Sequence, residues 1–240
     1  MHTKDNKTYF MNGVKGGIPI ALGYFAVSFT LGIAAKKAGI TAFQATFMSL
    51  TNVTSAGEFA GISSICAGVT YIELAIMQAV INLRYMLMSC ALAQRIDTSY
   101  PLYHRFIMGF GITDEIFGVS VTQPGRLSPY YTYGAMSVSI PAWCLGTCLG
   151  VVLGSVLPAN IVSALSVALY GMFIAIIMPP ARDNKVVLGL VIISMLLSSG
   201  FTYLPYLKNI SSGFRVIILT VVIAGVAAIL FPIEEDAQDE

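Results

Sequence analysis

Apolar segments of membrane-spanning length follow one another along almost the whole chain. A helix needs about 20 mostly apolar residues to cross the hydrocarbon core of a bilayer. The segments that meet or approach this length are residues 16–35, 42–70, 72–93, 132–157, 161–178, 186–203 and 214–231. The pattern predicts an all-α membrane protein with about seven transmembrane helices. It forms one polytopic domain over residues 1–240, between an N-terminal tail (1–15) and an acidic C-terminal tail (233–240).

The composition agrees with a membrane protein and excludes several other classes. The chain is 56% hydrophobic and 10% charged, whereas soluble domains carry about 25% charged residues. A net charge of +1 without a basic cluster gives no case for nucleic acid as a partner. Because the first apolar segment has spanning length, we expect a retained helix rather than a cleaved signal peptide. No metal or other cofactor is expected, since no His lies at ligand spacing from the cysteines. The four cysteines are instead expected to be buried apolar residues: Cys66, Cys90, Cys144 and Cys148.

The decad 51–60 (TNVTSAGEFA) is an unusually polar stretch inside the second apolar segment. On one continuous helix Thr51, Ser55 and Glu58 would share a face. A carboxylate at membrane depth is costly and usually marks a route for an ion, a proton or a substrate. The alternative is a polar stripe that only joins this helix to a neighbour. Because the segment is longer than a simple span, a break near residues 56–57 is also expected.

The third apolar segment carries a second group of polar residues. Gln78, Asn82, Tyr85 and Ser89 recur on one helical face, and Arg84 lies about 200° round the helix from Asn82 at 3.6 residues per turn. Either the helix unwinds here or Arg84 faces a second polar surface. Both possibilities require an internal partner, and an intramembrane carboxylate is the obvious one.

The segment 106–121 (FIMGFGITDEIFGVSV) has Asp114 and Glu115 in its middle. At about sixteen residues it is short for a span of about 20 residues. A half-helix or re-entrant segment that lines a cavity fits, because broken backbone is tolerated at such places. The alternative is an interfacial helix whose acids point to water. A weak internal repeat is also indicated, since residues 31–32 (Leu-Gly) align with residues 149–150 (Leu-Gly).

The charged residues inside the apolar segments indicate a binding site rather than an enzyme. The motifs HExxH, GxSxG and GxxxxGK[ST] are all absent from the sequence. Arg84, or the N-terminal end of a broken helix, could bind a carboxylate. Glu58 or the acids at 114–115 could bind an ammonium group. Glu58 and Asp114 are candidates for carrying a coupling proton, because burial disfavours the ionised form of a carboxyl group.

Four motifs resemble those of the AzlC family: GIPIALG at 17–23, SAGEFA at 55–60, NLRY at 82–85 and TDEIF at 113–117. The resemblance covers nearly the whole chain in motif order and spacing. It implies a membrane subunit of a branched-chain amino acid transporter or exporter that works with a small AzlD-like membrane subunit. The family commonly has Gln in place of Glu58 and His in place of Tyr85. A Glu at this position could add a proton-coupling group or shift the substrate preference.

Together these observations predict a secondary transporter subunit in a bacterial-type inner or plasma membrane. We expect it to export amino acids, Leu, Ile and Val above all, coupled to a proton gradient. The alternative is a non-transporting membrane subunit that stabilises or regulates a partner transporter. The predicted substrate-binding residues are Asn52, Thr54, Ser55, Gly57, Glu58, Asn82, Arg84, Asp114 and Glu115.

Overall fold

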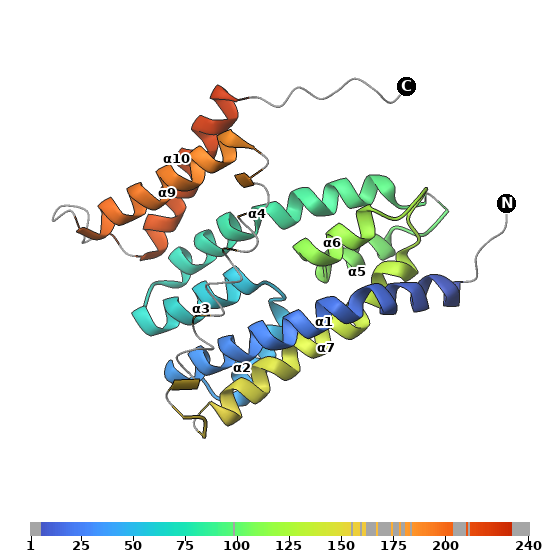
Figure 1. Ribbon diagram of the computed structural model, residues 1–240, viewed down its shortest axis with the longest axis horizontal. Coiled ribbons are helices and arrows are strands. Elements are labelled where there is room, and N and C mark those ends of the chain that lie inside the picture. Colours follow the sequence, from blue (N-terminus) through green and yellow to red (C-terminus); the bar gives the residue numbers. More distant parts are fainter. Residues whose placement is uncertain are drawn as a thin grey trace. The chain divides into compact units, whose positions relative to one another are not determined.

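The chain folds into helices, as the sequence predicts. The computed structural model describes residues 6–97, 99–154, 156–158, 184–203 and 212–231, and the single residues 160, 161, 167, 174, 178, 181, 182 and 210. Its helices are α1 (Asn6–Lys37), α2 (Ala42–Thr51), α3 (Ser55–Ala67), α4 (Tyr71–Arg95), α5 (Tyr103–Phe110), α6 (Asp114–Val121), α7 (Pro129–Leu153), α9 (Lys185–Tyr203) and α10 (Ser212–Leu230) (Figure 1). Most of the predicted span 161–178 and the C-terminal tail lie outside the described residues.

Three helices in the described part of the chain are long and apolar enough to cross a membrane, namely α1, α4 and α7. The predicted number of seven is therefore not confirmed. The second predicted span consists of two short helices, α2 and α3. The first span starts earlier than expected, because α1 begins at Asn6 and so includes most of the predicted tail. The reason is tertiary packing, since Gly13 and Gly17 in this region lie buried against α7.

The chain divides into two compact units. Unit 1 comprises residues 1–66 and 81–170, and unit 2 comprises residues 67–80 and 171–240. In unit 2, α9 packs against α10, and both helices expose large apolar side chains such as Leu196 and Ile229. Such faces suit contact with lipid. The candidate site lies entirely within unit 1.

The helices α1 and α7 pack closely through small residues. Gly13 lies against the backbone of Tyr131, Ser28 against Gly146, and Gly32 against Gly150. In each pair the second residue follows the first by 118 positions (131 − 13, 146 − 28 and 150 − 32), so the helices run parallel and in register. The two Leu-Gly dipeptides that align in the sequence therefore face each other across this contact, which we call the α1–α7 seam.

The helices α5 and α6 form a helical hairpin. At its start, Nδ1 of His104 lies 2.7 Å from the hydroxyl of Tyr133, near the beginning of α7. Near its end, the hydroxyl of Ser120 lies 3.1 Å from that of Thr132, so the chain returns to the same end of α7. The tip at residues 111–113 reaches Tyr24, in the middle part of α1. The predicted short segment is thus two short helices joined by a turn, and its position in the membrane stays a prediction.

The helices α2 and α3 form a second hairpin at the opposite end of unit 1. In Figure 1, both extend from their connection at 52–54 toward the end where α1 and α7 finish. The expected break is present, but it lies before residues 56–57, because the amide of Asn52 closes α2 on the Met48 carbonyl. Thr51 and Glu58 are thus on different helices, and the prediction that they share one face is wrong.

The four cysteines are less buried than the sequence analysis predicted. Cys66 and Cys90 are exposed, and Cys144 and Cys148 are half-buried. An apolar segment does not by itself imply burial, because a helix in a bilayer can turn apolar side chains outward to lipid.

Candidate functional site

The tips of the two hairpins lie beside Tyr24 of α1 and Trp143 of α7. The two aromatic rings meet edge to face, with their centroids 5.3 Å apart. Polar side chains gather on each side of this ring pair. We call one group the Glu58 cluster (Ser49, Glu58, Trp143 and Thr147) and the other the Arg84 cluster (Tyr24, Arg84, Thr113, Asp114 and Glu115).

The Glu58 cluster is sealed from solvent. The Glu58 side chain is 0% exposed, and Ser49 and Thr147 are equally buried. The hydroxyl of Ser49 lies 2.5 Å from Oε1 of Glu58, and Nε1 of Trp143 donates to Oε2 at 2.8 Å. Ser49 also lies 2.7 Å from the Thr147 hydroxyl. The carboxyl group is therefore held by α2 and α7 together, with neutral partners.

The Arg84 cluster contains an ion pair. Nη1 of Arg84 lies 2.8 Å from Oδ2 of Asp114, and the side chains are 37% and 23% exposed. Nη2 of Arg84 donates to the Tyr85 hydroxyl at 3.1 Å. Since α4 is continuous from Tyr71 to Arg95, the helix does not unwind at Arg84. Arg84 instead meets an internal carboxylate, as the sequence predicts.

The start of α6 shapes the rest of this cluster. The Thr113 hydroxyl caps the helix by accepting from the Ile116 amide at 3.2 Å. The Tyr24 hydroxyl lies 2.5 Å from Thr113 Oγ1 and donates to Oε2 of Glu115 at 2.6 Å. Both acids stand in the first turn of α6, where the helix dipole favours negative charge. The hairpin tip is therefore fixed to α1 and bears acidic groups that the helix itself stabilises.

The structure separates residues that the sequence analysis grouped together. It joins Arg84 to Asp114, but it places Glu58 in the other cluster. Thr54 caps α3 by accepting from the Gly57 amide at 3.3 Å, and Ser55 is the first residue of α3. Asn52 closes α2 through its backbone, and Asn82 is half-buried on α4.

Five residues of the clusters were missed by the sequence analysis: Tyr24, Ser49, Thr113, Trp143 and Thr147. Ser and Thr are common in membrane helices, and nothing local distinguishes Ser49 and Thr147. Trp143 did carry a signal, because it is the one tryptophan of the chain and stands deep inside an apolar segment. Tryptophan in membrane proteins usually lies at the membrane–water interface. A tryptophan in the middle of an apolar segment therefore indicates a nearby hydrogen-bond acceptor for its indole N–H.

Replacing Thr113 with alanine should destabilise the α5–α6 hairpin. The change removes the cap of α6 and the partner of Tyr24, and loss of such a cap costs about 0.5–2 kcal/mol. We expect a lower midpoint of thermal unfolding for the purified protein in detergent. Thr113→Ser keeps the hydroxyl and should behave as wild type. Equal unfolding midpoints for Thr113→Ala and Thr113→Ser would show that the cap does not hold the tip.

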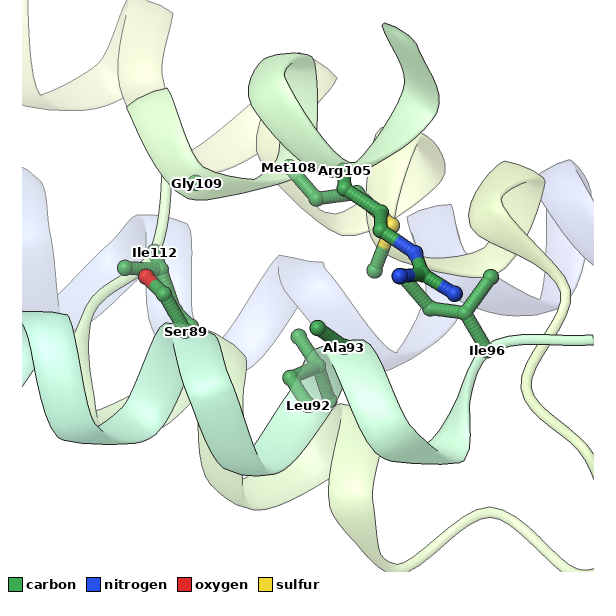
Figure 2. A pocket seen from close by; sticks show the side chains of 8 residues that line it. All are labelled: Ser89, Leu92, Ala93, Ile96, Arg105, Met108, Gly109 and Ile112. Atoms are coloured by element: carbon green, nitrogen blue, oxygen red, sulfur yellow. The ribbon is translucent and has the colours of Figure 1, made fainter. Parts of the chain in front are cut away.

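A small cavity lies between α4 and α5, away from both clusters. Its volume is about 10 Å³, which is room for roughly one water molecule. Figure 2 shows Arg105 and Met108 projecting from α5 toward α4 above this space. The remaining lining residues are Ser89, Leu92, Ala93, Ile96, Gly109 and Ile112. An amino acid is too large for it, and none of the predicted site residues lines it.

Comparisons with known proteins find one matching family and relatives that are named as membrane proteins. The model of a family described as AzlC protein matches residues 19–157, more than half of the chain. A protein of Archaeoglobus fulgidus named "Uncharacterized membrane protein" is 29% identical over 188 residues, which cover 78% of this chain and 82% of that protein. The "Inner membrane protein YgaZ" of Escherichia coli is 27% identical over 142 residues, which cover 58% of each protein. No solved structure matches.

With three apolar helices of spanning length and two relatives named as membrane proteins, the chain is a multi-pass integral membrane protein.

Proposed function

Because the chain belongs to the AzlC family of membrane proteins, we propose that it is the large subunit of a secondary transporter for amino acids. The proposed substrates are branched-chain amino acids, and the proposed direction is export driven by a proton gradient. A small AzlD-like membrane subunit is the proposed partner. The observation that carries the proposal is the ion pair of Arg84 and Asp114 at the tip of the α5–α6 hairpin.

This ion pair matches the charges of a free amino acid. An amino acid carries a carboxylate and an ammonium group on the same carbon atom. Its carboxylate can replace Asp114 as the partner of Arg84, and its ammonium group can replace Arg84 as the partner of Asp114. Partial exposure of 37% and 23% leaves both side chains accessible to such an exchange. The bound state then buries two compensated ion pairs, which avoids leaving a single charge at membrane depth.

A flexible apolar side chain packs beside the hairpin tip. A Cβ atom on Gly111 would overlap the side chain of Met136, so these two residues are in close contact, and both are buried in this structure. Methionine has a flexible, polarisable side chain that fits apolar groups of different shape. If Met136 moves aside when substrate binds, it would suit leucine, isoleucine and valine together better than a rigid side chain would.

Uptake into proteoliposomes tests this function directly. We expect vesicles that hold this chain and its small partner to exchange labelled leucine in a saturable way, with competition from valine and isoleucine. Analogues of leucine that lack one charge, 3-methylbutylamine and 4-methylpentanoate, should not compete, because each leaves Arg84 or Asp114 without a partner. Vesicles without protein are the control. Absence of flux in vesicles with both subunits would instead favour a non-transporting role.

A further inference from the structure

The Glu58 cluster forms a closed ring of four hydrogen-bonded contacts. Oε1 of Glu58 contacts Ser49, Ser49 contacts Thr147, and Thr147 contacts the backbone carbonyl of Trp143 at 3.2 Å. Nε1 of Trp143 then contacts Oε2 of Glu58 and closes the ring. Each contact needs one hydrogen atom, so the ring requires four.

The number of hydrogen atoms depends on the protonation of Glu58. Ser49, Thr147 and the Trp143 indole supply one each. If Glu58 is ionised, these three hydrogens cannot fill four contacts, because Ser49 lies near two acceptors and has one hydrogen to donate. If Glu58 is protonated, it donates to Ser49, Ser49 donates to Thr147, and Thr147 donates to the carbonyl of Trp143. The arrangement in this structure is complete with a neutral Glu58.

The surroundings also disfavour a carboxylate at this place. The side chain is 0% exposed, and burying an unpaired charge is costly. The titratable groups nearby are Cys144 of α7, which interacts electrostatically with Glu58, and Tyr24 of α1 behind Trp143. Tyr85 of α4 lies near Thr54 at the start of α3. None of these groups supplies a positive charge. The features that favour the anion are the dipole at the start of α3 and the hydrogen bonds to Ser49 and Trp143, and neither places a counter-ion beside the carboxyl group.

We propose that Glu58 is the site that binds the coupling proton, separate from the Arg84–Asp114 pair, and that Trp143 connects the two. This inference rests on the proposed transport function. Because the cluster is closed to solvent in this structure, the proposal requires a second conformation in which Oε1 of Glu58 gives its proton to water and takes it back from water. No other reactant is needed. Its loss removes the fourth hydrogen and leaves one contact of the ring empty. The contact between α2 and α7 is then weakened, since Ser49 and Thr147 join these two helices.

Trp143 connects the loss of the Glu58 proton to the proposed substrate site. Its indole nitrogen holds Glu58, while its ring packs against Tyr24. The Tyr24 hydroxyl in turn holds Thr113 and Glu115 at the tip that carries Asp114. A shift of the indole therefore alters the position of the α5–α6 tip. Trp143 is a positioning residue in this scheme, and it touches neither Arg84 nor Asp114 in any hydrogen bond that the described residues make.

Glu58→Gln separates proton binding from folding. A glutamine amide can donate to Ser49 and accept from Trp143, so the ring stays complete, but no proton can leave. With both subunits in vesicles, we expect flux driven by a proton gradient to fall at least tenfold more than leucine exchange does. The infrared band of a protonated carboxyl group should disappear in Glu58→Gln and persist in Asp114→Asn. Asp97→Asn, in the exposed loop after α4, is the control and should change neither measurement.

Trp143→Phe tests the connection and remains informative if Glu58→Gln does not assemble. It keeps a ring against Tyr24 but removes the hydrogen bond to Oε2. That bond stabilises the ionised form of Glu58 more than the neutral form, so without it Glu58 keeps its proton up to a higher pH. The pH above which proton-driven flux falls should therefore move upward. An unchanged pH profile, or an infrared band that survives Glu58→Gln, would overturn the inference. Absence of leucine flux in the wild type would instead refute the transport function, while the infrared result would still report on Glu58.

Discussion

Replacing Arg84 with alanine is expected to lower leucine flux by about 100-fold, equivalent to about 2.8 kcal/mol at 1.4 kcal/mol per factor of ten. The change removes the group that would bind the substrate carboxylate and leaves Asp114 without its partner. Removing one member of a buried ion pair costs about 3–5 kcal/mol, and the partial exposure of this pair places the loss near the lower limit. Initial rates of labelled leucine uptake into proteoliposomes provide the measurement.

Two further variants decide whether this ion pair binds substrate or only stabilises the fold. Arg105→Ala removes an arginine of α5 outside both clusters, and its flux should remain within about twofold of wild type. The exchange of Arg84→Asp with Asp114→Arg restores the attraction but reverses its direction. Recovered assembly without recovered flux supports a binding site. Full recovery of flux by this exchange, or normal flux in Arg84→Ala, would mean that the pair is structural.

Replacing Gly150 with alanine is expected to prevent stable packing of α7 against α1. The added Cβ atom would overlap the carbonyl oxygen of Phe29 and lie 3.0 Å from Cα of Gly32. These are backbone atoms, so no side chain can rotate away, and the helices must separate along the α1–α7 seam. Overpacking typically costs about 1–3 kcal/mol and occasionally more. We expect a lower midpoint of thermal unfolding in detergent and a smaller folded fraction on extraction.

Gly23→Ala in α1 is the matched control for the seam. A Cβ atom at Gly23 would meet no other atom within 4 Å. Because alanine favours a helix over glycine by about 1 kcal/mol, this variant should be neutral or slightly stabilised. Similar losses of stability in both variants would show that the effect comes from the helix backbone rather than from the seam.

The sequence predicted the local features of this fold better than its long-range contacts. The unusual polar decad, the short segment with two acids and the arginine in the middle of the third apolar segment all signalled irregular backbone or an internal charge partner. The start of α1 at Asn6 was not predictable from hydropathy, because it depends on Gly13 packing against α7 more than 100 positions later.

The surroundings of Glu58 were not predicted from the sequence. The sequence analysis grouped Glu58 with Arg84 among the substrate-binding residues, because charged residues inside a membrane usually face a common interior. The structure instead surrounds Glu58 with neutral residues, namely Ser49 of α2 and Trp143 and Thr147 of α7. A neutral carboxyl group needs hydrogen-bond partners rather than a counter-ion, and periodicity does not show which hydroxyl groups of distant helices will meet it.

The separation of the two clusters has a consequence for the response to membrane voltage. Tyr24 and Trp143, beside which both clusters lie, belong to the middle parts of α1 and α7. An amino acid that exchanges partners with Arg84 and Asp114 carries no net charge, so its movement does no work against the field. If Glu58 binds the coupling proton near the middle of the membrane, a proton that reaches it from one side crosses roughly half of the membrane, which at 100 mV is worth about 1.2 kcal/mol. Under the proposed mechanism, the electrical driving force would therefore act on the proton at Glu58 and not on the uncharged substrate.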